Sequence, residues 1–113
     1  MSTLTITAAQ IAQLNDRFRR NLSGGGLRVI TAGIASLPPA DQAIILARVM
    51  AFDTFTPGND PNGEHDFGSI ALAEMCIFWK IDTYADDSLT FGAEDPTDPK
   101  AVRVLTIMLA EEY

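Results

Sequence analysis

The residue types best suited to metal or acid–base chemistry gather in one acidic, turn-rich stretch, Asp60–Asp66, with the sequence DPNGEHD. Its oxygen-bearing residues alternate as in a calcium loop. The match is incomplete, because the glycine stands at the fourth position instead of the sixth and the twelfth position is Ala71, which cannot coordinate. One histidine and one distant cysteine also fall short of the usual zinc ligand count. Asx turns explain this composition without a metal, so we expect no cofactor and keep a small metal-assisted hydrolase as an alternative.

His65 is a candidate general base, with Asp53, Asp66 or Asp82 as the carboxylate that would orient it. No nucleophile or oxyanion motif accompanies it. The single cysteine, Cys76, is expected to be an inert small residue within a strand. We therefore predict that the chain is not an enzyme, and we assign no catalytic residue.

The charge of the chain is uneven as well as negative, with a net value of −7. Residues 1–48 carry five arginines against two aspartates, whereas residues 49–113 carry three basic against thirteen acidic residues. An acidic surface repels nucleic acid, whose binding needs Lys and Arg, and it attracts a basic protein surface. We predict that the partner-binding surface consists of Asp60, Glu64, Asp66, Asp82, Asp86, Asp87, Glu94 and Asp95.

The composition fits one globular domain that spans residues 1–113, with 47% hydrophobic and 20% charged residues. The longest nearly uncharged apolar run, Ala43–Phe52, is interrupted by Arg48 and has about half the length that a membrane span needs. The N-terminus shows no secretory signal, and one cysteine allows no internal disulfide. We therefore expect a cytoplasmic protein.

The first element that must position these residues is an amphipathic helix. Thr7 has capping-box spacing to Gln10, and apolar residues then recur on one face from Ile11 to Leu22. Three arginines in the last turn complement the helix dipole. The run Ser23–Gly26 is expected to end the helix.

A strand over Leu27–Ala35 and a second helix over Ala40–Phe52 follow, the helix being introduced by two prolines. This helix is apolar around most of its circumference, which is typical of a buried helix or of one whose second face meets a partner. Homodimerisation is therefore a further hypothesis, and changing Ile44 or Val49 to Asp would test it.

The strands Phe67–Leu72 and Met75–Tyr84 alternate with period two and form a hairpin across a two-residue turn. Ile77, Trp79 and Ile81 would face the core. Phe78 shares the opposite face with Lys80 and Asp82, and we expect this face either to pack beneath the first helix or to form a contact site.

A short strand over Leu89–Gly92 and a helix over Pro99–Glu112 complete the prediction, the helix being started by Asp98 and Pro99. The predicted order is α-β-α-β-β-β-α. This is an α+β domain with helices packed on a small, largely antiparallel sheet.

Several blocks of sequence resemble a small domain-of-unknown-function family that is carried on plasmids, phages and integrative elements of proteobacteria. They are GEHDFG at 63–68, FWKID at 78–82, GAEDP at 92–96 and RVLTIMLAEEY at 103–113. The chain departs from the family at the hairpin turn Ala73-Glu74, where a glycine is expected, and at Thr83, where an aromatic residue is more typical. The resemblance implies a bacterial host cell but no established chemistry and no catalytic residues.

Mobile-element context and acidic charge together favour an inhibitor of host defence, of the anti-CRISPR or anti-restriction type. Such a protein would bind stoichiometrically to a basic nucleic-acid-binding surface as a DNA mimic. The alternative is a homo-oligomeric accessory or regulatory protein of plasmid maintenance, which would bind a partner through the apolar second helix.

Overall fold

The first helix begins as its capping signal predicts. The computed structural model describes residues 6–21 and 25–113. Helix α1 (Ala8–Arg20) has Thr7 as N-cap, and the Thr7 N–H donates to the Gln10 side chain over 2.8 Å while the Gln10 N–H donates to Thr7 Oγ1 over 3.2 Å. The helix ends before the predicted terminator Ser23–Gly26. Leu22, Ser23 and Gly24 lie outside the described residues.

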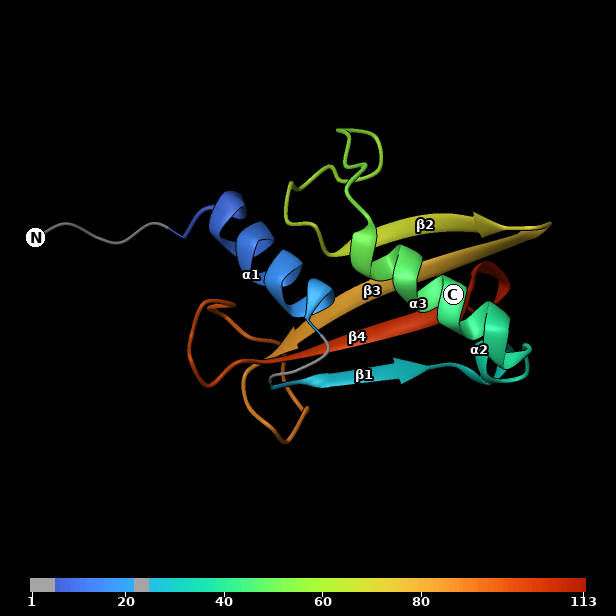
Figure 1. The fold of residues 1–113 in the computed structure, drawn as a ribbon. Coiled ribbons are helices and arrows are strands. Elements are labelled where there is room, and N and C mark those ends of the chain that lie inside the picture. Colours follow the sequence, from blue (N-terminus) through green and yellow to red (C-terminus); the bar gives the residue numbers. More distant parts are fainter. Residues whose placement is uncertain (1–5, 22–24) are drawn as a thin grey trace, which may run out of the picture.

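A four-stranded mixed sheet forms the centre of the fold (Figure 1), which confirms the predicted α+β class. Its strands are β1 (Leu27–Ile30), β2 (Phe67–Leu72), β3 (Met75–Tyr84) and β4 (Val102–Leu109), in the spatial order β1-β4-β3-β2. The pairs β2·β3 and β3·β4 are antiparallel, and β1·β4 is parallel.

The predicted helix over Pro99–Glu112 is wrong, because this segment forms β4 and a 3₁₀ turn, η1 (Ala110–Glu112). Strand β4 lies between β3 and β1, where both of its edges find hydrogen-bond partners. The Glu112 carboxylate then accepts a hydrogen bond from the Gly33 N–H over 3.0 Å.

Two shorter predictions also need correction. The predicted strand Leu27–Ala35 stops at Ile30, and a short helix, α2 (Ala32–Ala35), follows it. The predicted strand Leu89–Gly92 is a loop that touches β3 through a single bridge between Tyr84 and Gly92. The observed order is α-β-α-α-β-β-β followed by η1.

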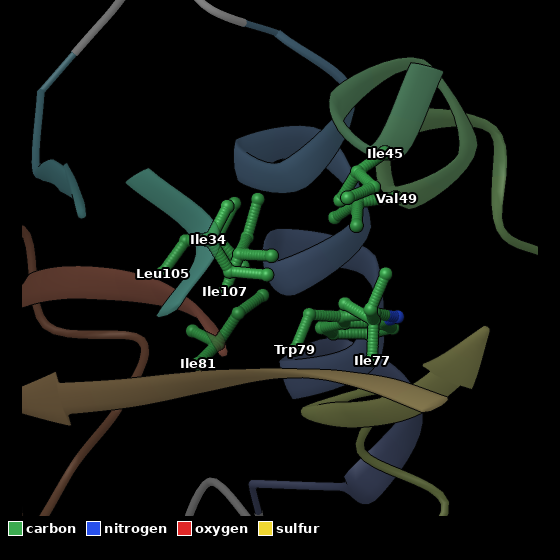
Figure 2. Close-up of a cluster of buried hydrophobic side chains, with 8 residues drawn as sticks. All are labelled: Ile34, Ile45, Val49, Ile77, Trp79, Ile81, Leu105 and Ile107. Carbon is green, nitrogen blue, oxygen red and sulfur yellow. The ribbon is translucent and has the colours of Figure 1, made fainter. Parts of the chain in front are cut away.

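Helix α3 (Pro39–Ala51) confirms the second predicted helix and packs with α1 and α2 on one face of the sheet, as Figure 1 shows. Ile44 is 42% exposed, whereas Val49 is fully buried, so Val49 is not available to a partner. Figure 2 shows the core between helices and sheet. It consists of Ile34, Ile45, Val49, Ile77, Trp79, Ile81, Leu105 and Ile107.

The hairpin β2–β3 has the predicted boundaries, and its inner-face residues Ile77, Trp79 and Ile81 are buried as expected. The outer face is not packed beneath α1, so that expectation is wrong. Phe78 instead contacts Phe67 and Tyr113 there, with ring centroids 5.1 and 5.7 Å away. Among the described residues, no helix is long and apolar enough to cross a membrane.

Candidate functional site

The eight predicted partner-binding carboxylates belong to two different parts of the fold. Asp60, Glu64 and Asp66 lie in the loop that leads into β2, and Asp82 lies on β3. The other four lie in the β3–β4 connection, residues 85–101. They are Asp86, Asp87, Glu94 and Asp95.

Three aspartates of the β3–β4 connection are held by the backbone that follows them. The carboxylates of Asp86, Asp95 and Asp98 each accept a hydrogen bond from the N–H two residues later, over 2.9, 2.8 and 2.8 Å. These are Asx turns. Hydrogen bonds from Ser88 lower the pKa of Asp86, and hydrogen bonds from Thr97 lower that of Asp95. The connection therefore presents ionised carboxylates in fixed positions.

An exposed aromatic ring accompanies these carboxylates. Phe91 is 74% exposed, and the chain around it is anchored because the Ala85 N–H donates to the Phe91 carbonyl over 2.8 Å. Phe91, Glu94, Asp95 and Asp98 line a hollow of about 340 Å³. No Lys or Arg occurs between residues 85 and 98. We name residues 85–98 the acidic connection.

The loop before β2 is less available to a partner. Asp60 is 8% exposed, and the Asp82 carboxylate lies 3.0 Å from Lys80 Nζ. Burial, followed by repulsion from neighbouring carboxylates, raises the pKa of both Glu64 and Asp66. The predicted acidic surface is therefore divided, since two of these four carboxylates are buried or paired.

His65 is oriented by carboxylates that differ from the three considered in the sequence. Its Nδ1 lies 3.0 Å from both oxygens of Asp16 on α1, and its Nε2 lies 3.6 Å from Asp60 Oδ2. The ring stacks on Phe55 with centroids 3.7 Å apart. Asp16 is 49 positions away along the chain, and no local pattern could indicate it. Both ring nitrogens face carboxylates, and no nucleophile is among these contacts, so the arrangement joins the loop to α1.

The same contacts continue to an arginine whose burial no sequence pattern indicates. Arg19 is fully buried, and its guanidinium donates to Asp16 over 2.9 Å and to the Val49 carbonyl over 2.7 Å. Burial lowers the pKa of Arg19, which the hydrogen bond to Asp16 partly offsets. The three side chains Asp16, Arg19 and His65 thus fix α1, α3 and the loop before β2 to one another.

Metal ligands are not grouped in the described part of the chain. Within residues 6–21 and 25–113, no three His, Cys, Asp or Glu side chains lie together in a way that could hold a metal ion. Cys76 lies in a strand, as expected, but is exposed there, with Sγ 3.4 Å from Ser69 Oγ.

One of three comparisons with known proteins finds a match. A family model described as a protein of unknown function (DUF3768) matches residues 30–112. No curated protein matches the chain significantly. No solved structure does so either.

Proposed function

The chain belongs to the DUF3768 family of proteins of unknown function, and we propose that it is a stoichiometric, non-catalytic protein that binds a cationic surface of a partner protein. More specifically, we propose that the protein is the product of a mobile element and acts in the bacterial cytoplasm. Its partner is then the nucleic-acid-binding subunit of a host nuclease or CRISPR effector complex.

The observation that carries the proposal is the acidic connection. Its Asx turns hold carboxylates in place before a partner arrives, which reduces the entropy lost on binding. Surfaces that bind nucleic acid are rich in Lys and Arg, and carboxylates in fixed positions pair with such groups through charge-assisted hydrogen bonds. Phe91 adds an exposed ring over which an Arg or Lys can stack.

The decisive experiment is affinity capture from proteobacterial lysates that contain restriction or CRISPR complexes, at low and high salt. Asp87→Lys combined with Glu94→Lys reverses two exposed carboxylates that make no side-chain hydrogen bond among the described residues. We expect wild type to recover a nucleic-acid-binding subunit in a salt-sensitive manner, and the variant to recover at least about tenfold less.

The matched control reverses the same number of charges elsewhere. Glu74 in the hairpin turn and Glu111 in η1 are both exposed, so Glu74→Lys combined with Glu111→Lys changes the net charge equally outside the acidic connection. This control should keep its partner. Equal loss in both double variants, or a partner that is insensitive to salt, would contradict the proposal.

A second candidate function, self-association, is favoured by the outer face of the sheet. None of the α-helices that the structure describes lies on this face (Figure 1), and the strand register places Leu27 and Val29, 47% and 42% exposed, on it beside β4. Its charged residues on β3, Lys80 and Asp82, are paired over 3.0 Å. Two copies can therefore meet here without like-charge repulsion, despite the net charge of −7.

Sedimentation velocity over a range of protein concentrations tests self-association. Val29→Asp places a charge on the outer face, and Ile44→Asp places the same charge on α3 at an equally exposed position. If the sheet face is the interface, only Val29→Asp gives monomer at concentrations where wild type is dimeric. Monomeric wild type at all concentrations, or loss only in Ile44→Asp, would contradict this candidate.

A further inference from the structure

A basic pocket contrasts with the negative charge of the whole chain. It encloses about 450 Å³ between the C-terminal half of α1, the start of β1 and the segment that enters β4, a size within the range of small-molecule sites. Half of the eight basic residues of the chain line it, and its described lining includes no acidic residue. These basic residues are Arg17, Arg28, Lys100 and Arg103.

Arg28 is held in the pocket by groups that leave its charge uncompensated. One terminal nitrogen, Nη2, donates to the carbonyls of Phe18, over 3.0 Å, and Asn21. The guanidinium carbon lies 4.3 Å from the centre of the Phe18 ring. Nε is buried without a hydrogen-bond partner, and no carboxylate among the described residues pairs with this side chain.

Arg103, on the neighbouring strand β4, is held in the same way. Its Nε donates to Asn15 Oδ1 over 2.8 Å and its Nη2 to the Pro96 carbonyl over 2.7 Å. Burial lowers the pKa of this guanidinium, which again has no carboxylate partner in the described chain. An anion bound beside it would offset part of the cost of desolvation.

The remaining walls combine apolar surface with a fixed backbone. Leu14 and Phe18 of α1 contribute apolar surface. Gly26 has a φ of +92°, and a Cβ there would lie 2.5 Å from the Phe18 ring and 2.6 Å from the Arg103 carbonyl oxygen. The turn into β1 is therefore packed tightly against α1 and β4. The guanidinium groups of Arg28 and Arg103 are thus positioned before any ligand binds.

We propose that this pocket binds a small phosphate monoester whose organic part is apolar. The guanidinium groups of Arg28 and Arg103 each keep a terminal nitrogen that can donate to a ligand. Together with the exposed cations of Arg17 and Lys100, they match the three oxygens and nearly two negative charges of such a phosphate at neutral pH. A single carboxylate would neutralise less of this charge. The apolar walls would contact the organic part of the ligand.

Phenyl phosphate, benzoate, phenol and inorganic phosphate together test this assignment, because they separate charge from the aromatic ring. Binding is measured by calorimetry and by amide chemical shifts of the ¹⁵N-labelled full chain. We expect saturable binding of phenyl phosphate, with shifts at the pocket residues. Benzoate and inorganic phosphate should each bind at least about fivefold more weakly, and phenol should not bind.

Arg17→Gln and Lys100→Gln remove exposed cations of the pocket and should each weaken phenyl phosphate binding about fivefold. Arg20→Gln is the matched control, because Arg20 is an exposed arginine of the same helical turn that does not line the pocket. It should leave the affinity unchanged. An equal loss in Arg20→Gln, preference for benzoate, binding of phenol, or no saturation at about 10 mM phenyl phosphate would overturn the proposal.

Discussion

The guanidinium of Arg19 lies 4.9 Å from the ring of Trp79, and both side chains are fully buried. This arginine belongs to α1, yet it donates to the carbonyls of Val49 and Met50 in the last turn of α3. The Val49 carbonyl also accepts the Phe52 N–H, over 3.3 Å. Arg19 therefore adds a second donor there and supplies a partner to the Met50 carbonyl at the end of α3. One side chain thus completes a second helix and covers the central aromatic residue of the core.

Arg19→Met should lower the free energy of unfolding by about 3 kcal/mol, because it removes these hydrogen bonds and the charge partner of Asp16 while keeping an apolar stem. Urea denaturation followed by tryptophan fluorescence measures the change. Arg20→Met, at an exposed position of the same helix, should change stability by less than about 0.5 kcal/mol. Similar losses in the two variants would contradict this role of Arg19 at the end of α3.

Gly68→Ala should destabilise the fold because of the close approach of β2 to Trp79. A Cβ at Gly68 would lie 2.3 Å from Trp79 Nε1, and the Trp79 ring is fully buried in the core. We expect a loss of about 2 to 3 kcal/mol, together with a shifted tryptophan emission spectrum. Gly58→Ala, where the nearest contact is 3.7 Å away, is the control. A stable Gly68→Ala variant with unchanged emission would contradict this prediction.

Asp66→Asn should stabilise the protein at neutral pH. Burial and the charges of Asp60 and Asp82 raise the pKa of Asp66 in the folded chain, so its ionised form opposes folding. This destabilisation is present above the folded pKa and disappears as the pH falls through that value. The gain should be on the order of 0.5 kcal/mol at pH 7 and near zero at about pH 3, as measured by urea denaturation at both pH values.

Asp87→Asn serves as the reference for Asp66→Asn, because Asp87 is exposed. It reports the general effect of removing one negative charge from the chain. A gain in Asp66→Asn that equals this reference, or that persists at low pH, would mean that the environment of Asp66 is not responsible.

Ala73→Gly should stabilise the hairpin turn. Ala73 has a φ of +54° in the two-residue connection between β2 and β3, a conformation that glycine adopts without the steric cost paid by alanine. We expect a gain of about 0.5 kcal/mol in chemical denaturation. Ala71→Gly, within β2, should instead lose stability, and a loss in both variants would contradict the steric explanation.

Features that depend on neighbours in the sequence were predictable. The Thr7 cap, the extent of α3 and the hairpin follow from spacings of a few residues, and the structure reproduces them. The sequence does not distinguish strand β4 from a helix, because both faces of the strand are largely apolar. Leu105, Ile107 and Leu109 face the helices, while Val102, Val104 and Met108 line the outer face. Because neither face is clearly polar, apolar and polar residues do not alternate along the strand, and the period of a helix fits the same residues.

The candidate site was predictable in composition but not in geometry. The sequence identifies the acidic residues and the exposed turns of the acidic connection. It does not indicate that Asp60 is buried or that Asp16 orients His65, because these facts depend on α1 packing against a loop far along the chain. The sequence does not indicate the basic pocket for the same reason, since the pocket joins Arg17 and Arg28 to Lys100 and Arg103 across the fold.

The position of β4 has a consequence for biosynthesis. This strand follows the other three in the sequence but lies between β1 and β3. Leu27 in β1 therefore cannot pair with Val104 until β4 has been synthesised. A chain emerging from the ribosome can form α1 and the β2–β3 hairpin early, yet β1 cannot join the hairpin in one sheet until β4 is made. The core should therefore close late and in a single step, and until then nascent chains would expose the edges of β1 and β3 to chaperones.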